Sequence, residues 1–163
     1  MLRFIFIFLL SISSFSQGSL NDVLNKFNKE TVPYIYVDDL KKDIDNVLLL
    51  DSREFKEYTV SHLNKAIYVG YKNFNLSKTL EKLPREKSSK IVVYCSLGVR
   101  SENIAEKIKK AGYTNVYNLY GGIFEWKNDN NKVVNPQNKS TEKVHAYDKD
   151  WGKWLTKGIK IYD

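Results

Sequence analysis

The stretch VVYCSLGVRS, residues 92–101, decides the fold. An apolar, β-branched run ends at Cys95, a short loop containing Gly98 follows, and a helix is predicted over residues 101–111. In open parallel sheets, ligands bind outside the carboxyl ends of the strands. The sequence therefore places its single cysteine where substrates usually bind.

On either side of this stretch, short apolar runs alternate with segments of helical spacing. The alternation predicts an α/β fold with a central parallel five-stranded sheet, right-handed crossovers and helices on both faces. We expect strands over residues 34–37, 47–50, 66–69, 91–94 and 116–119. Helices are expected over residues 20–29, 53–58, 76–83 and 101–111, with a further short helix carrying Trp126.

The loop after Cys95 suggests a particular chemistry. Gly98 allows backbone conformations closed to other residues, so several amide N–H groups can point at one anion beside the helix N-terminus. Arg100 adds a cation with planar donors. This environment should lower the pKa of Cys95 and favour the thiolate, which is the reactive form. The thiolate would take a sulfur atom from a donor and pass it on as a persulfide, which is two-step covalent catalysis.

The alternative for Cys95 is a buried, inert thiol, which composition alone favours. Neither of the two histidines, His62 and His145, is marked as a catalytic partner. One cysteine and two distant histidines do not make a zinc site, so neither a metal nor another cofactor is indicated.

The two ends of the chain differ from the middle. Residues 1–16 have a positive Arg3, an apolar run and small residues at a possible cleavage site, the layout of a signal peptide. This predicts an exported protein, periplasmic or secreted, with no stable membrane span after cleavage. The open alternative is an uncleaved N-terminal membrane anchor.

Charge and the C-terminal segment give weaker indications. The net charge is +7, but the lysines are dispersed among acidic residues and no nucleic-acid motif accompanies them. A basic surface of this kind can attract small anions or acidic partners. Residues 135–163 are first polar and then aromatic, and they form either an appendix packed on the domain or a docking surface for a protein partner. Four residues of this segment follow i, i+4, i+7 and i+8 spacing: Tyr147, Trp151, Trp154 and Leu155.

Four ordered segments resemble the single-domain rhodanese family, whose members are thiosulfate sulfurtransferase-like proteins. They are LLLDSREFKEY (48–58), SHLNKAIYV (61–69), CSLGVRS (95–101) and YNLYGGIFEW (117–126). Together they are far more specific than any one alone. The resemblance covers residues 32–134 as a rhodanese-like domain. With it, the predicted domain plan is residues 1–16 as a signal peptide, 17–31 as a helical lead, 32–134 as this domain and 135–163 as an extension.

The resemblance also implies roles for individual residues. Cys95 would be the nucleophile that carries sulfur. Structural support is implied for Asp51, Arg53 and His62. The loop that cradles the sulfur would consist of Ser96, Leu97, Gly98, Val99, Arg100 and Ser101.

Some positions depart from the family pattern. Ser61, Asn64 and Lys65 replace a glycine, a proline and a glycine, and residues 130–131 replace a common glycine. These departures question the turns and not the site.

The leading hypothesis is an exported sulfurtransferase that moves a sulfane sulfur from thiosulfate or a persulfide to a thiol or cyanide. The alternative is a non-catalytic sulfur carrier or partner-binding module. Phosphatase or arsenate reductase activity ranks third. Four residues separate Cys95 from Arg100, whereas the related phosphatases have five, which gives a wider loop for a phosphate.

Overall fold

Strand β4 (Ile91–Tyr94) forms the centre of the sheet in the computed structural model, which describes residues 18–163. All four of its residues are buried, and they alternate between two cores. Ile91 and Val93 pack into one cluster, and Val92 and Tyr94 into the other, because successive side chains of a strand point to opposite faces. The centre of the sheet is therefore covered on both sides.

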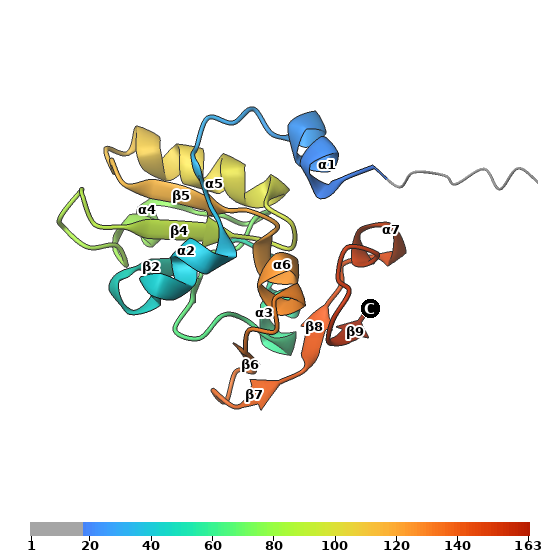
Figure 1. The fold of residues 1–163 in the computed structure, drawn as a ribbon. Coiled ribbons are helices and arrows are strands. Elements are labelled where there is room, and N and C mark those ends of the chain that lie inside the picture. Colours follow the sequence, from blue (N-terminus) through green and yellow to red (C-terminus); the bar gives the residue numbers. More distant parts are fainter. Residues whose placement is uncertain (1–17) are drawn as a thin grey trace, which may run out of the picture.

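The sheet has five parallel strands, as the sequence predicts, and their order is β1-β5-β4-β2-β3. In Figure 1, α5 covers one face and α2 and α6 cover the other. The strands are β1 (Tyr34–Ile35), β2 (Leu48–Asp51), β3 (Ile67–Tyr68), β4 and β5 (Val116–Leu119). The helices are α1 (Leu20–Phe27), α2 (Val37–Lys42), the 3-10 turn η1 (Ile44–Asn46), α3 (Phe55–Val60), α4 (Leu76–Leu80), α5 (Val99–Lys110) and α6 (Gly122–Asn128).

Several element boundaries differ from the predicted ones. Val37 begins a helix and does not end a strand, and α4 stops at Leu80. Helix α5 begins at Val99, two residues earlier than predicted, because Gly98 is its N-cap in a left-handed conformation with φ 107°. Helix α3 begins at Phe55 because Glu54 is its N-cap, with the Glu57 carboxylate accepting the backbone N–H of Glu54 at 3.0 Å.

The segment after residue 132 contains structure that the sequence did not predict. Two small strand pairs form there, and a single-turn helix joins the strands of the second pair (Figure 1). The elements are β6 (Val133–Val134), β7 (Ser140–Thr141), β8 (Lys143–His145), α7 (Lys149–Gly152) and β9 (Ile159–Ile161). Strands β8 and β9 are parallel, so β8, α7 and β9 form a small β-α-β unit beside the main sheet.

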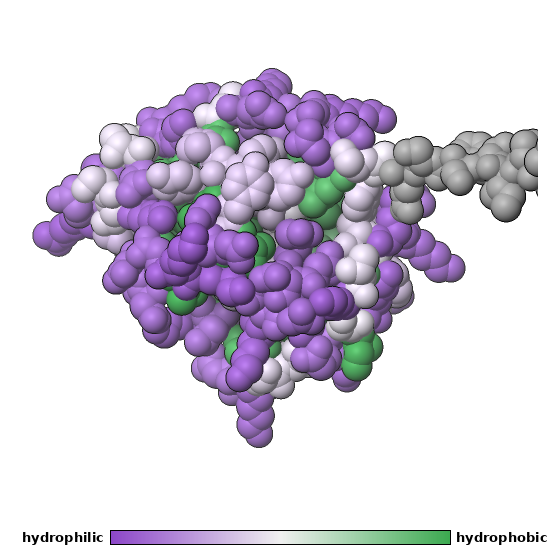
Figure 2. Space-filling model, in the orientation of Figure 1, coloured by the Kyte–Doolittle hydropathy of each residue, from purple (hydrophilic) through white to green (hydrophobic). Residues whose placement is uncertain are grey.

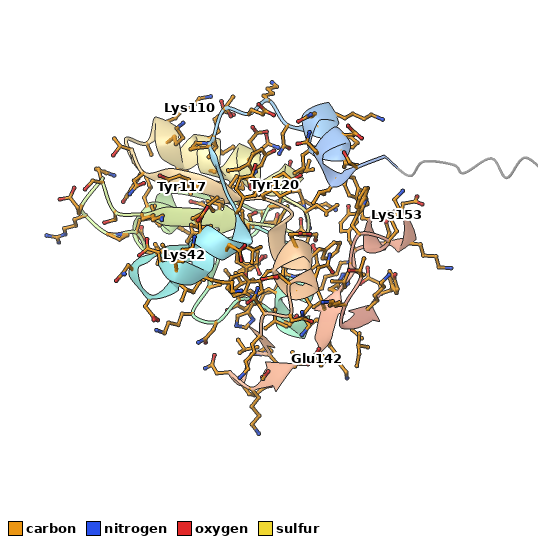
Figure 3. The ribbon with its side chains drawn as sticks, in the orientation of Figure 1. Lys42, Lys110, Tyr117, Tyr120, Glu142 and Lys153 are labelled. Carbon is orange, nitrogen blue, oxygen red and sulfur yellow. The ribbon has the colours of Figure 1, made fainter. Side chains whose placement is uncertain are left out.

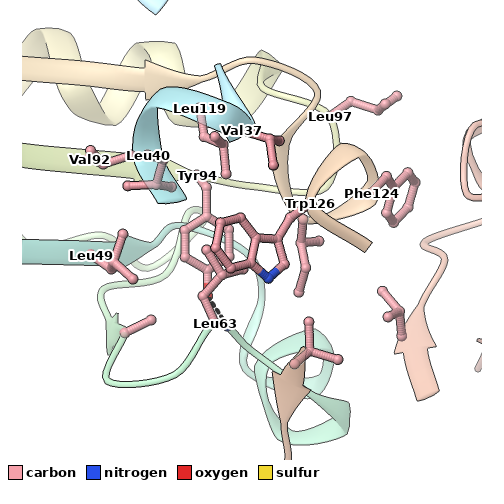
Figure 4. Close-up of a cluster of buried hydrophobic side chains, with 14 of the residues drawn as sticks. Val37, Leu40, Leu49, Leu63, Val92, Tyr94, Leu97, Leu119, Phe124 and Trp126 are labelled. Atoms are coloured by element: carbon pink, nitrogen blue, oxygen red, sulfur yellow. Dashed lines mark hydrogen bonds between the residues drawn. The ribbon is translucent and has the colours of Figure 1, made fainter. Parts of the chain in front are cut away.

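This β-α-β unit belongs to the core. Val144, Ala146 and Leu155 are fully buried in the same cluster as Tyr94 and Trp126. Figure 4 shows that cluster, with the backbone N–H of Leu63 donating to the Tyr94 hydroxyl at 3.0 Å. The extension and the sheet therefore share one hydrophobic core.

The outer surface is mainly hydrophilic on the face shown in Figure 2. Charged side chains are spread over it, from Lys42 and Lys110 on the sheet domain to Glu142 and Lys153 on the extension (Figure 3). Within residues 18–163, none of the helices has the length and apolar character needed to cross a bilayer. The predicted signal peptide, residues 1–16, lies outside the described part of the chain.

Candidate active site

Cys95 follows β4 directly and lies at the floor of a cavity of about 100 Å³. Only 2% of the residue is exposed, and Cys95 is nevertheless one of the residues that line this cavity. The backbone N–H of Gly98 points at its sulfur, with an N–Sγ distance of 3.1 Å. The turn before α5 therefore directs a main-chain donor at the position where negative charge would develop.

A second hydrogen-bond network fixes the side of the loop that faces β5. The Asn118 amide donates to the Gly98 carbonyl at 2.7 Å, so its oxygen faces Ser101, whose hydroxyl donates to it at 2.6 Å. That hydroxyl also lies 3.5 Å from the Cys95 sulfur. Asn118 thereby positions both the loop and a hydroxyl beside the sulfur.

The N-terminus of α6 holds the other side of the loop. Its first amides bind the loop carbonyls: Ile123 N–H donates to Cys95 O at 2.9 Å and Phe124 N–H to Ser96 O at 3.1 Å. Gly122 makes this approach possible, since a Cβ there would lie 2.3 Å from Cys95 O, with φ at 56°. The glycine pair at residues 121–122 is therefore part of the site's construction.

Arg100 lies beside the loop and binds Glu57. Its two terminal nitrogens each lie 2.7 Å from an oxygen of that fully buried carboxylate, and one also donates to Ser96 Oγ at 3.0 Å. Because both of its terminal nitrogens bind Glu57, the guanidinium does not offer the free fork that binding a phosphate would use. Arg100 is therefore held beside the loop as one half of an ion pair.

Electrostatics in the site act on Cys95 in two directions. Burial raises the pKa of the thiol, but the Arg100 charge and the hydrogen bonds from Ser101 and Gly98 outweigh it, so the pKa of Cys95 lies below its usual value. Glu57 behaves similarly. Burial raises the pKa of its carboxyl, but Arg100 and then Arg53 lower it to about 2. At neutral pH the site therefore holds an ionised Glu57–Arg100 pair beside a thiol whose pKa lies below its usual value.

The three residues implied as structural support lie away from the sulfur. Asp51 and Arg53 form a fully buried ion pair, with Nη2 2.6 Å from Oδ2, and Arg53 also donates to Ser61 O. The ring of His62 stacks on Tyr58 with 4.0 Å between centroids, and its backbone pairs with Val134. Burial lowers the pKa of His62, which keeps the ring neutral at pH 7. Asp51 and Arg53 therefore join the end of β2 to the end of α3, and His62 links α3 to β6.

A family model described as a rhodanese-like domain matches residues 36–129, which is more than half of the chain. The chain belongs to this family. The rhodanese match includes β2, the cysteine loop and α6, which are the elements that build the site.

Relatives and solved structures agree with this assignment. A tRNA uridine(34) hydroxylase from Sodalis glossinidius is 33% identical over 119 residues, which cover 72% of this chain and 34% of the relative. The corresponding protein of Hamiltonella defensa is 36% identical over 92 residues, covering 55% of this chain and 26% of the relative. The chain thus spans about a third or less of the length of these relatives.

Among solved structures, a rhodanese-related protein from Thermoplasma volcanium has a TM-score of 0.55 and 27% identity, covering 63% of this chain and 97% of its own. Thiosulfate sulfurtransferase from Pseudomonas aeruginosa has a TM-score of 0.58 at 20% identity, covering 76% of this chain and 23% of its own, and shares the fold.

Sequence reasoning missed two residues of this rhodanese site. Glu57 lies in a segment predicted as a helix and is assigned no role there. The usable signal was an acidic residue that closely follows a buried strand, in a chain whose cysteine loop carries one arginine without a local partner. Asn118 is a polar residue within the apolar run of β5, and that contrast was the available signal. Both reach the loop through contacts between distant parts of the sequence, which local patterns do not reveal.

Proposed function

We propose that this rhodanese-family chain is a sulfurtransferase that carries a sulfane sulfur on Cys95. The observation that carries the proposal is the Gly98 N–H directed at the Cys95 sulfur on the floor of a cavity. Family membership supports sulfur transfer or a related activity at a coarse level. The specific donor and acceptor are part of the proposal.

The chemistry proceeds in two balanced steps. The Cys95 thiolate attacks the outer sulfur of thiosulfate, the S–S bond breaks, and sulfite leaves with the bonding electron pair. Cys95 then holds a persulfide anion, which the Gly98 amide and the Arg100 charge stabilise. A thiolate or cyanide attacks the terminal sulfur, forms a new persulfide or thiocyanate, and releases the Cys95 thiolate.

The proposal is tested by mass spectrometry of the intact protein after treatment with thiosulfate or an alkyl persulfide. We expect one added sulfur atom on the wild type and none on Cys95→Ser, with the adduct removed by a thiol or cyanide. The absence of any sulfur adduct with every donor would overturn the proposal. Sulfur loading without turnover would instead identify a sulfur carrier.

We also propose that the protein acts outside the cytoplasm, on the basis of the N-terminal sequence alone. Cell fractionation with N-terminal sequencing of the recovered protein tests this, and the expected result is an extracytoplasmic protein that begins after residue 16. Recovery in the cytoplasm with an intact N-terminus would contradict it.

A further inference from the structure

The cavity above Cys95 has walls from two different parts of the chain. One wall belongs to the cysteine loop and the start of α5. The other belongs to the extension, which lies outside residues 36–129 matched by the family model. The lining residues are Cys95, Ser96, Leu97, Val99 and Arg100 from the loop side, and Tyr147 and Trp151 from the extension.

The two extension residues are held in place by the structure around them. Tyr147 has φ 68°, a left-handed conformation that is unusual for tyrosine, and its N–H donates to His145 Nδ1 at 3.1 Å. Its ring lies 5.0 Å from the guanidinium carbon of Arg100. The backbone N–H of Trp151 donates to the carboxylate of Asp148, the N-cap of α7, at 2.8 Å. The Trp151 ring contacts Phe27 with 5.5 Å between the ring centroids. The wall is therefore built into the β-α-β unit.

The charge of the cavity disfavours an entering dianion. Arg100 is the only cation among the lining residues, and its charge is already matched by Glu57. Once Cys95 ionises, Arg100 faces two negative groups, the Glu57 carboxylate and the thiolate, so the three groups together carry a net negative charge. A doubly charged donor would lose hydration there without gaining a free cation.

The remaining lining is apolar and small. Leu97, Val99, Tyr147 and Trp151 supply apolar side-chain surface around the entrance. The cavity of about 100 Å³ is smaller than the ~150 Å³ cavity that holds benzene in another protein. The space therefore suits a substituent of one or two carbons next to the sulfur centre.

We propose that Tyr147 and Trp151 determine donor specificity, selecting sulfane donors with a small apolar substituent and a single negative charge over inorganic dianions. This inference rests on the proposed sulfur transfer at Cys95 and names its substrate class.

A matched pair of donors isolates the effect. Methanethiosulfonate differs from thiosulfate by one methyl group in place of one charged oxygen, so the two have similar size. In each case the Cys95 thiolate attacks the outer sulfur and the S–S bond breaks. The electron pair leaves on methanesulfinate or sulfite, and Cys95 keeps one persulfide charge.

The experiment measures the second-order rate constant for sulfur loading of the full chain with each donor, by mass spectrometry at fixed ionic strength. The informative quantity is the rate ratio of methanethiosulfonate to thiosulfate, because comparing this ratio between variants cancels the intrinsic reactivity of the donors. We expect the ratio to fall about fourfold in Tyr147→Ala and in Trp151→Ala, the factor that corresponds to ~0.8 kcal/mol for one buried methyl-sized group.

Tyr36→Ala is the matched control, because Tyr36 is an exposed tyrosine (54%, against 43% for Tyr147) that does not line the cavity. Its ratio should equal that of the wild type. Thermal unfolding of each variant verifies the fold. Because Tyr147 is exposed, Tyr147→Ala still tests donor specificity even if Trp151→Ala is unstable.

The outcomes separate the two proposals. If both donors load the Tyr147 and Trp151 variants normally and the rate ratio is unchanged, the proposed role of these two residues in donor specificity is overturned. The sulfurtransferase proposal is unaffected by that result. If the wild type takes sulfur from no donor, the sulfurtransferase proposal fails and the specificity inference fails with it.

Discussion

Glu57 lies fully buried beside the cysteine loop, and its carboxylate binds both terminal nitrogens of Arg100. Its pKa in the folded protein, about 2, is below the ordinary value of 4.5. A carboxyl with a depressed folded pKa stabilises the protein above its unfolded pKa, and that stabilisation is lost as the pH falls through the folded pKa. The pair therefore links the site to the acid stability of the whole domain.

Replacing Glu57 with glutamine tests this link. At pH 7 we expect Glu57→Gln to lower the free energy of unfolding by on the order of 3 kcal/mol, at ~1.4 kcal/mol per pKa unit. The difference from wild type should fall to roughly half or less by pH 3, because the wild-type carboxyl is then losing its contribution. Urea denaturation at several pH values measures it. A difference that stays constant from pH 7 to pH 3 would contradict the assigned pKa.

Ser101 contributes to the ionisation of Cys95 through two hydrogen bonds that lower the pKa of the thiol: one from its backbone N–H, and one from its hydroxyl, whose proton the sulfur shares with Asn118 Oδ1. We expect Ser101→Ala to raise the pKa of Cys95 and reduce the thiolate fraction at neutral pH. The rate of alkylation by iodoacetamide as a function of pH measures this shift. Ser61→Ala is the control, since Ser61 is an equally buried serine whose hydroxyl has no hydrogen-bond partner. An equal pKa in both variants would exclude Ser101 from this role.

Among the elements, α6 supports the cysteine loop, because Gly122 lets the start of this helix lie against the loop backbone. A Cβ at this position would lie 2.3 Å from Cys95 O and 2.7 Å from Ser96 O, and these are backbone atoms that cannot rotate away. Gly112 also has a positive φ, but nothing lies within 4 Å of its added Cβ. A substitution at either glycine carries the strain of a positive φ, and only at Gly122 does it also clash with backbone atoms.

We expect Gly122→Ala to destabilise the protein by about 2–3 kcal/mol more than Gly112→Ala does. Because the clash falls on the cysteine loop, Gly122→Ala should also slow sulfur loading of Cys95, and Gly112→Ala should not. Thermal unfolding and the mass measurement give the two readouts. Equal effects of the two substitutions would show that α6 does not brace the loop.

Elements that are determined by their own local sequence are predicted well, and elements that depend on contacts with distant segments are not. Strands β4 and β5 lie where the sequence predicts them, since a buried run bounded by polar residues marks an inner strand. The edge strands β1 and β3 pair over only two residues each, so their ends depend on one neighbour. Strands β6 to β9 span only two or three residues each, which is too short for a hydrophobic period to mark them.

The same contrast applies to the site. Cys95, Gly98 and Ser101 belong to one short segment, and that segment alone indicates an anion-binding loop. Glu57 and Asn118 come from other elements, and only the folded sheet brings them to the loop. Tyr147 and Trp151 were recognised as an aromatic group, but their place over Cys95 depends on the β-α-β unit that the sequence did not reveal.

At the scale of the whole molecule, the extension and the sheet domain share a core. Leu155 is fully buried in the cluster that contains Tyr94 and Trp126, and the amide of Asn128 in α6 donates to Trp154 O at 2.8 Å. The extension should therefore unfold together with the sheet and not as a separate unit.

We expect Leu155→Ala to lower the free energy of unfolding by 2–5 kcal/mol, the usual range for a buried leucine, with unfolding still in a single transition. Ile159→Ala, at a residue of the same extension that is 54% exposed, should change it by less than about 0.5 kcal/mol. Denaturant titration followed by tryptophan fluorescence and circular dichroism measures both. Two separate transitions would mean that the extension folds independently.

The aromatic wall of the cavity, formed by Tyr147 and Trp151, also limits how closely the Cys95 residues of two copies can approach each other. A disulfide between molecules needs the two sulfur atoms about 2 Å apart. Cys95 is 2% exposed at the floor of a cavity narrowed by Tyr147 and Trp151, so two such sulfurs cannot approach that closely while the wall stays in place. Oxidation should therefore not produce disulfide-linked dimers. The Cys95 thiol can react with small molecules but not with the Cys95 thiol of a second copy.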